Sequence, residues 1–220
     1  MIGCKSNQIT ENKLADYQFP LDSLISPKVF IFQRTDSLDK LSYHYQQLIK
    51  KDNQMILIRS SLGVGDMRDS SVYSVIDNHV VLKESYMIIQ DKKTTQIKAS
   101  KGDIKVNEDN GLNIETKIKY VNPFHESMNS TVDFKLDNDT LIKYRLFDED
   151  LTCIKYKANM DVYIKHKYIP LIGKEIKKHG EYIYAKNIGL IYYSFFDDKD
   201  NSGFSWRLKE IIDYNDFIKK

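Results

Sequence analysis

Residues 154–168 read IKYKANMDVYIKHKY and alternate between apolar and polar side chains throughout. A period of two residues is typical of a half-buried β-strand, whereas on a helix this pattern would place apolar side chains all round the axis. At about 3.3 Å per residue, a strand of this length would span roughly 50 Å. Because strands twist, one this long must coil. The stretch therefore predicts a strongly curved sheet. The face that holds most of its apolar side chains is formed by every second residue: Ile154, Tyr156, Ala158, Met160, Val162, Ile164, His166 and Tyr168.

Shorter strands are expected on both sides of this segment, because apolar runs or alternating patterns recur between clusters of turn residues. The expected strands are residues 28–34, 38–49, 54–60, 71–77, 79–90, 93–98, 113–120, 132–136, 142–146, 181–187, 189–196 and 204–212. Residues 38–49 also fit a helical stripe, and we favour a strand because strands surround them. A loop is expected at 61–70, a loop or a ragged hairpin at 100–111, and a turn at Asn138-Asp139. Residues 170–180 are expected to be a crossover with one helical turn at 174–179.

These segments predict a mainly β protein with little helix. Short hairpins join most of the expected strands, so the sheet should be antiparallel. One apolar and one polar face per strand predicts a sheet that is covered on one side only. A sheet of about ten or more strands curls or closes, so we expect a single large curved sheet, either a half-barrel or an open barrel. Residues 19–220 are expected to form this one domain.

The N-terminus contains a second signal. Ile2-Gly3-Cys4 matches the end of a bacterial lipoprotein cleavage box, in which a small residue precedes the cysteine that receives the lipid. Residues 5–18 are polar and short of large apolar side chains, which is typical of a flexible tether. We therefore expect residues 1–18 to be a lipid attachment point and tether, with the lipid on Cys4. The charged and apolar leader that precedes such a box is not part of the sequence, so a cytosolic protein with a chance Cys4 is the alternative.

The remaining composition argues against several function classes. Lys plus Arg number 33 and Asp plus Glu number 31, which is not the basic surplus of a nucleic-acid-binding protein. The five histidines lie far apart along the chain, and no metal-ligand spacing, cofactor motif or catalytic group is evident. Cys153 follows an apolar pattern and is expected to be a small packed residue, although a disulfide with Cys4 is open in an oxidising compartment. We expect no metal, no cofactor and no enzymatic activity.

The segment Gly180–Tyr193, GEYIYAKNIGLIYY, resembles a hairpin near the end of β-rich lipoproteins of Bacteroidetes-type bacteria. Many proteins of this group have no assigned function. Some adopt a curved antiparallel half-barrel similar to the lipoprotein carrier and receptor of the outer-membrane sorting pathway. The resemblance implies a cell-envelope address and a curved sheet, and it transfers no functional residue.

Two functions remain open for such a domain. The concave face of the sheet could bind an apolar or lipid ligand, with Met160, Val162 and Ile164 on that face. Alternatively, the domain is a surface-anchored interaction or scaffold module with a filled core and no small ligand. A weaker third class is a hydrolase formed by loops 61–70 and 100–111. In each case we expect a monomer on the envelope membrane, at the periplasmic or outer-membrane surface.

Overall fold

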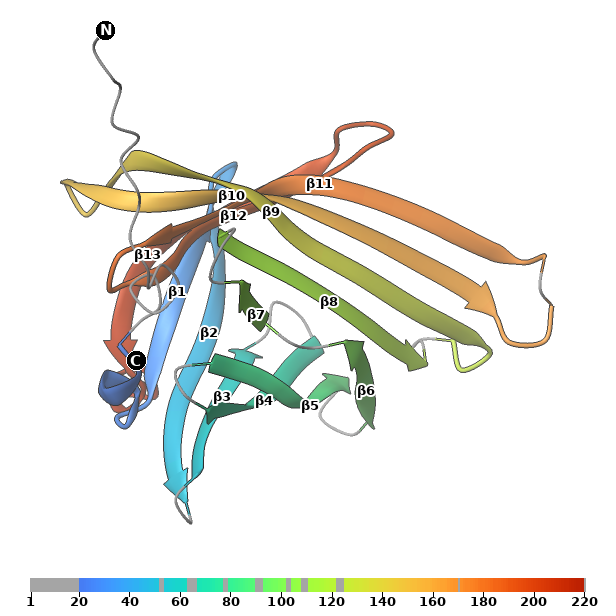
Figure 1. The fold of residues 1–220 in the computed structure, drawn as a ribbon, viewed down its shortest axis with the longest axis horizontal. Coiled ribbons are helices and arrows are strands. Elements are labelled where there is room, and N and C mark those ends of the chain that lie inside the picture. Colours follow the sequence, from blue (N-terminus) through green and yellow to red (C-terminus); the bar gives the residue numbers. More distant parts are fainter. Residues whose placement is uncertain are drawn as a thin grey trace, which may run out of the picture.

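The computed structural model describes residues 20–51, 54–62, 67–76, 79–89, 93–101, 104–107, 111–121, 125–169 and 171–219. Residues 1–18, with Cys4 and the expected tether, lie outside the described residues. Within the described part of the chain, thirteen strands form one antiparallel sheet (Figure 1). A mainly β fold with one large curved antiparallel sheet and little helix is therefore confirmed.

The strands follow one another with short connections. Their bounds are β1 (Lys28–Arg34), β2 (Ser37–Lys51), β3 (Gln54–Leu62), β4 (Met67–Ile76), β5 (His79–Ile89), β6 (Lys93–Lys101), β7 (Ile104–Asn107), β8 (Gly111–Val121), β9 (Met128–Leu146), β10 (Glu149–His166), β11 (Gly173–Ala185), β12 (Gly189–Asp197) and β13 (Gly203–Asp213). The described helices are a 3-10 turn, η1 (Leu21–Leu24), and α2 (Tyr214–Phe217). Neither has the length and apolar composition that a helix needs to cross a bilayer.

The first and last strands lie side by side in the middle of the sheet. The strand order is β6-β5-β4-β3-β2-β1-β13-β12-β11-β10-β9-β8-β7. One meander runs from β1 to β6, the other returns from β13 towards β7, and the β1–β13 ladder joins them. A ladder of three residue pairs, from Lys98↔Lys119 to Lys101↔Lys117, also links β6 to β8. The sheet therefore curves until its far strands touch, which is nearer to an open barrel than to a half-barrel.

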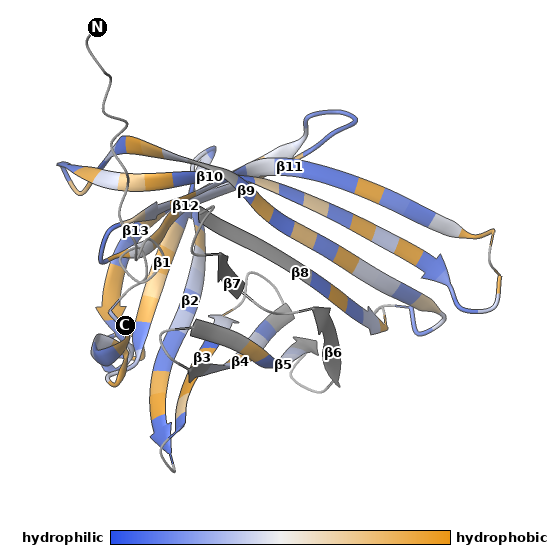
Figure 2. Ribbon diagram, in the orientation of Figure 1, coloured by the Kyte–Doolittle hydropathy of each residue, from blue (hydrophilic) through white to orange (hydrophobic). Residues whose placement is uncertain are grey.

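The long alternating segment is confirmed as a strand. It lies within β10, which is 18 residues long and ends at His166 rather than Tyr168. Its neighbour β9 is 19 residues long, and Figure 2 shows the alternation of hydropathy as bands along both strands. Residues 38–49 are also a strand, within β2. Residues 104–107 pair with the start of β8, so the expected loop at 100–111 contains a short hairpin.

Three local predictions were wrong. Asn138-Asp139 is not a turn: Lys155 pairs with Thr140 and Lys157 with Asp137, so two residues of β9 lie opposite Tyr156 in a β-bulge. A bulge and a turn favour similar residues, and only the pairing with β10 distinguishes them. Residues 174–179 are not helical, because they continue β11 opposite the end of β10. The expected loop at 61–70 is also too long, since β4 begins at Met67.

Two clusters of buried side chains make up the core of the described residues. The larger cluster extends from η1 and β1–β3 across β13 to the hairpin ends of β9–β12. The smaller one lies on β9, β10 and β12 and contains Ile154, Tyr156 and Ala158. Cys153, which belongs to the larger cluster, is completely buried. Because Cys153 and Ile154 point to opposite faces of β10, the sheet is covered on both sides here. The prediction of a sheet covered on one side only is wrong at this position.

Candidate ligand-binding face

The register of the ladders shows which side chains share the face of Ile154 and Tyr156, because residues directly opposite on neighbouring strands point to the same side. Met160 lies opposite Phe134, Val162 opposite Val132, and Ile164 opposite Ser130. Met160, Val162 and Ile164, together with Val132 and Phe134, are half-buried. The structure thus places the three predicted residues side by side in an apolar row. We call Val132, Phe134, Met160, Val162 and Ile164 the apolar strip.

This face of the sheet is concave, as contacts between strands that are not neighbours show. His44 on β2 and Tyr193 on β12 are three positions apart in the strand order, a separation of about 14 Å in a flat sheet. Their ring centroids are 6.2 Å apart. Phe32 on β1 contacts both rings, with centroids at 4.9 Å from His44 and 5.5 Å from Tyr193. The sheet therefore bends so that side chains of its two meanders face each other.

Tyrosines line the concave face beside the apolar strip. Tyr156 is buried and its ring lies 5.8 Å from that of Tyr184. Tyr182 lies 6.4 Å from Tyr184, 5.8 Å from Tyr193 and 5.5 Å from Phe134 of the apolar strip. We call Tyr156, Tyr182, Tyr184 and Tyr193 the interior tyrosines. Their rings form a continuous aromatic row that leads to the apolar strip.

Three of the interior tyrosines combine deep burial with accessible surface. Burial raises the pKa of Tyr184 and of Tyr193 to about 12, and raises that of Tyr182 well above its usual value. The side chains of all three are nevertheless only half-buried. Each ring is therefore largely enclosed by the curved sheet and keeps a small accessible surface. At neutral pH these hydroxyls keep their protons, so they can donate hydrogen bonds.

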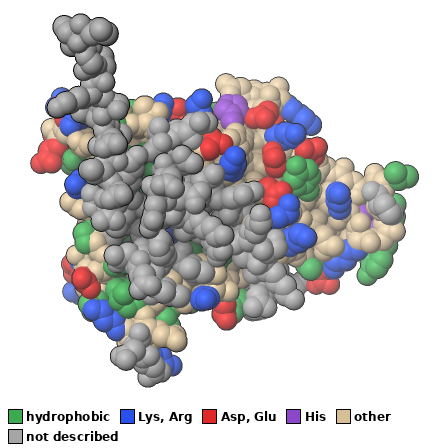
Figure 3. All heavy atoms as spheres, in the orientation of Figure 1, with side chains coloured by type: hydrophobic (Ala, Val, Ile, Leu, Met, Phe, Trp, Pro, Cys, Tyr) green, Lys and Arg blue, Asp and Glu red, His purple; other side chains and the backbone are tan. Residues whose placement is uncertain are grey.

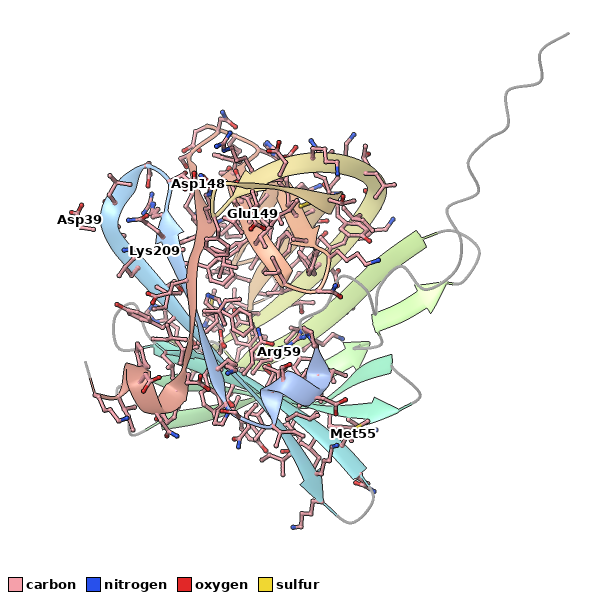
Figure 4. The ribbon with its side chains drawn as sticks, turned by 90° about the vertical axis from the view of Figure 1, so that its left-hand side faces the viewer. Asp39, Met55, Arg59, Asp148, Glu149 and Lys209 are labelled. Carbon is pink, nitrogen blue, oxygen red and sulfur yellow. The ribbon has the colours of Figure 1, made fainter. Side chains whose placement is uncertain are left out.

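The opposite wall of the concave face carries charged and polar side chains. Arg59 on β3 lies over the ring of Tyr73 on β4, with its guanidinium carbon 5.4 Å from the ring centroid. Its positive charge also acts on Tyr184 of β11, whose pKa it lowers against the effect of burial. Figure 4 shows Arg59 near the middle of the molecule, whereas Asp39 and Lys209 lie towards its edge. Arg59 therefore faces the interior tyrosines across the concave face.

His44 belongs to the same wall. Its Nε2 lies 3.0 Å from the hydroxyl of Ser42. Burial lowers the pKa of His44, and the nearby Asp69 carboxylate opposes this effect. His44 is therefore a neutral, hydrogen-bonded histidine that packs among aromatic rings. No group of three His, Cys, Asp or Glu side chains in the described part of the chain could hold a metal ion.

The sequence reasoning missed Arg59 and the interior tyrosines. Arg59 ends the apolar run Gln54–Ile58 and is a charged residue in a strand that otherwise looks buried. Such a residue is a signal, because a buried charge is normally paired or functional. Tyr182 and Tyr184 share a face by alternation, but Tyr193 shares it only because of a register shift between Ile183 and Tyr184. The alternation alone does not reveal that shift.

Two surface hollows lie elsewhere. One, of about 440 Å³, lies over β10–β12 beside Gly180 and is lined by Lys157, His179 and Glu181 among others. His179 Nδ1 there lies 2.6 Å from Asp198 Oδ1. The other, of about 350 Å³, lies between the β1–β2 and β9–β10 turns. Figure 3 shows charged side chains of both signs interspersed over the described surface.

The buried Cys153 thiol is no part of a site. It lies 3.6 Å from the Leu151 carbonyl oxygen, and burial raises its pKa to about 11. A thiol with a raised pKa carries little thiolate at neutral pH and is a poor nucleophile. The prediction of a small packed residue is confirmed. His166, at the end of β10, accepts hydrogen bonds at Nδ1 from the backbone N–H groups of Tyr168 and Ile169.

No protein-family model matches the chain, and no curated protein matches it. Two solved structures are similar to it. A candidate exported protein with a YmcC-like fold from Bacteroides fragilis is 13% identical, with 85% of this chain and 95% of that chain covered and a TM-score of 0.45. A candidate lipoprotein from Parabacteroides distasonis is 13% identical, with 88% and 97% covered and a TM-score of 0.44. A likeness of this degree is no evidence of a shared ligand or activity.

Proposed function

We propose that this protein is a cell-envelope lipoprotein, anchored through a lipid on Cys4, whose concave face binds an apolar ligand such as an acyl chain. The observation that carries the ligand is the row formed by the interior tyrosines and the apolar strip. A filled core would bury these side chains completely, yet Tyr182, Tyr184, Met160 and Val162 all keep accessible surface. From Tyr156 to Ile164 the row follows β10 for roughly 26 Å, which suits a long acyl chain.

Ligand binding is tested with the full chain carrying Cys4→Ser, so that no attached lipid interferes. Purified protein is extracted for lipid mass spectrometry and titrated with a fluorescent fatty acid. We expect lipid to co-purify or the probe to bind with saturation. Val162→Asp should weaken binding at least tenfold, because it puts a carboxylate on the apolar strip.

Val121→Asp is the matched control, since Val121 on β8 lies opposite Asn129 on the other face of the sheet, is 38% exposed and should tolerate a charge. Circular dichroism and thermal unfolding verify that both variants fold. No co-purified lipid and no probe binding by the Cys4→Ser protein would overturn the ligand proposal and favour an interaction or scaffold module. Equal loss of binding in both variants would overturn the placement of the site on the apolar strip.

The anchor is tested separately. The gene is expressed with its natural upstream region in cells fed an alkyne-labelled palmitate. We expect label on the membrane-bound protein, loss of label with Cys4→Ser, and no loss with Cys153→Ser. Label that survives Cys4→Ser, or an unlabelled wild-type protein, would overturn the anchor without touching the ligand proposal.

A further inference from the structure

Arg59 has no ion-pair partner among the described residues. It is half-buried on the concave face, and its Nε is fully buried without a hydrogen-bond partner among the described residues. Its interactions there are with Tyr73 and Tyr184, both neutral. A buried guanidinium is normally paired with a carboxylate or a phosphate. An anion that enters the concave face would therefore supply the charge and hydrogen-bond partner that Arg59 lacks among the described residues.

A carboxylate of this wall, that of Asp69, is already engaged. Asp69 lies two pairs further along the β3–β4 ladder on the same face, where Ser61 pairs with Asp69 and Arg59 pairs with Ser71. Its Oδ1 accepts a hydrogen bond of 3.2 Å from the Ser61 backbone N–H. Its charge acts on His44 and Tyr193. Within the described residues, no carboxylate forms an ion pair with Arg59.

The surroundings of Arg59 suit one end of an elongated ligand. Tyr184 keeps its proton because its pKa is about 12, so its hydroxyl can donate a hydrogen bond to an oxyanion. From Tyr184 the aromatic row continues through Tyr182 to Phe134, which lies opposite Met160. A charged head at Arg59 would therefore place an attached hydrocarbon chain along the interior tyrosines and over the apolar strip.

We propose that Arg59 binds the carboxylate of an amphipathic, fatty-acid-like ligand whose chain lies on the apolar strip. This inference rests on the proposed function and names the chemical class of its ligand. The guanidinium offers two parallel N–H donors to a carboxylate, and the partial burial of Arg59 strengthens the pairing. An uncharged analogue of the same length would fill the strip but leave the guanidinium unpaired.

The test compares palmitate with 1-hexadecanol on the full chain carrying Cys4→Ser, by displacement of a fluorescent fatty acid. We expect the acid to bind about tenfold more tightly than the alcohol. Arg59→Gln should remove that preference by lowering the affinity for palmitate, while the affinity for hexadecanol stays unchanged. Arg59→Lys keeps the positive charge but loses the paired N–H donors of the guanidinium, so it should retain part of the preference for palmitate. It replaces Arg59→Gln in the test if that variant does not fold. Arg207→Gln is the control, because Arg207 is exposed and engaged with Tyr144 and the Arg145 carbonyl.

The outcomes separate this inference from the proposed function. If neither palmitate nor hexadecanol binds, the proposed function itself fails. If both bind equally and Arg59→Gln changes neither, the apolar face stands and the role of Arg59 is overturned. If Arg59→Gln folds but loses affinity for both ligands equally, the role of Arg59 in binding the carboxylate is also overturned, because Arg59 would then be a packing residue.

A different observation carries a second inference. The β10–β11 connection exposes large apolar side chains: Tyr168 is 81% exposed, Ile169 45%, Leu171 97% and Ile172 49%. A hydrogen bond of 2.9 Å from the His166 N–H to the Ile172 carbonyl oxygen joins the two strand ends that carry these residues. A contiguous exposed apolar patch marks a contact surface. We call these four residues the apolar tip.

The charges around the apolar tip indicate what covers it. Lys165, Lys167 and Lys174 flank it and are exposed. Basic residues beside an apolar protrusion complement anionic lipid headgroups, and tyrosine is favoured where headgroups meet acyl chains. We infer that the apolar tip enters the headgroup region of an anionic bilayer. The contact is independent of the Cys4 lipid and of the concave face.

Vesicles of phosphatidylglycerol or of phosphatidylcholine are sedimented with the Cys4→Ser protein. We expect binding to the anionic vesicles that falls with added salt, and at least tenfold weaker binding to the zwitterionic ones. The double variant Tyr168→Asp/Leu171→Asp should abolish binding, while Leu38→Asp, at a residue that is 72% exposed on β2, should preserve it. No binding to anionic vesicles, or unchanged binding of the double variant, would overturn the inference and leave a protein partner to be sought for the apolar tip.

Discussion

The two halves of β10 share one sequence pattern and have different surroundings. In the first half, Cys153, Ile154, Tyr156 and Ala158 are at most 2% exposed. In the second half, residues 159–166, no side chain is buried, although Met160, Val162 and Ile164 continue the same apolar parity. The first half is stabilised by packing on both faces, whereas the second half offers an apolar face that nothing in the described chain covers fully. The alternation sets the direction of a side chain but not what lies against it.

The largest predicted effect is a difference in stability between the same substitution, isoleucine to alanine, made in each half of β10. Ile154→Ala should lower the free energy of unfolding by about 4 kcal/mol, because it leaves a cavity in a packed cluster. Ile164→Ala should lower it by less, about 2 kcal/mol, since part of that side chain is already accessible. Urea unfolding at equilibrium measures both. Similar losses would show that the second half is as well packed as the first.

The next effect concerns the boundary between the halves. Ala158 pairs with Gly180 on β11, and a Cβ on Gly180 would lie 1.9 Å from the Ser194 carbonyl oxygen on β12. The close approach admits only glycine, so Gly180→Ala should destabilise the fold by about 3 kcal/mol through a forced backbone shift. Gly173→Ala is the milder control, with its nearest atom, the Ile164 carbonyl oxygen, at 2.8 Å. If both variants unfold at the same temperature, β11 and β12 do not approach so closely.

A third effect is a loss of stability at alkaline pH. Burial raises the pKa of Cys153 to about 11, and those of Tyr184 and Tyr193 to about 12. The unfolded chain releases these protons at about pH 8.5 and 10, so above pH 8.5 the unfolded state binds fewer protons and stability falls. Thermal unfolding between pH 8 and pH 11 should show the melting temperature fall by several degrees. Cys153→Ser should remove the early part of this decrease, and a flat profile would contradict the burial of these groups.

The smallest effect should come from the outer face of the first half. Lys155 Nζ lies 3.0 Å from Glu181 Oε1, with the two side chains 35% and 44% exposed. Partly exposed ion pairs contribute little in water, so Lys155→Ala should change the free energy of unfolding by less than about 1 kcal/mol. The same urea titrations measure it. A loss as large as that of Ile154→Ala would mean that the outer face is far less solvated than the structure indicates.

The outcome at particular residues shows how far the sequence could be interpreted. The period of two correctly assigned Met160, Val162 and Ile164 to one face of a long strand, because the side-chain direction of a strand follows from its covalent geometry. Asn138-Asp139 could not be assigned, because a pair of turn-forming residues suits a β-bulge equally well and the partner strand decides between them. The alternation at 174–179 was overlooked for a similar reason, since its partner lies at the end of an unusually long β10.

Arg59 and Tyr184 could not be associated from the sequence at all. They lie on β3 and β11, five positions apart in the strand order, and would be about 24 Å apart in a flat sheet. Only the curvature of the sheet brings their side chains to face each other. No local pattern predicts the amount of that curvature, because it results from the twist of every strand between them.

The sequence by itself determined a mainly β protein with a coiled long strand and an apolar row on one of its faces, because local alternation is enough to orient side chains. The tertiary structure alone decided that the first half of β10 is buried on both faces and that the second half is left half-covered. It alone placed Arg59 opposite the interior tyrosines. Burial and pairing depend on strands that are distant in the chain, and those strands meet only when the whole sheet has curved.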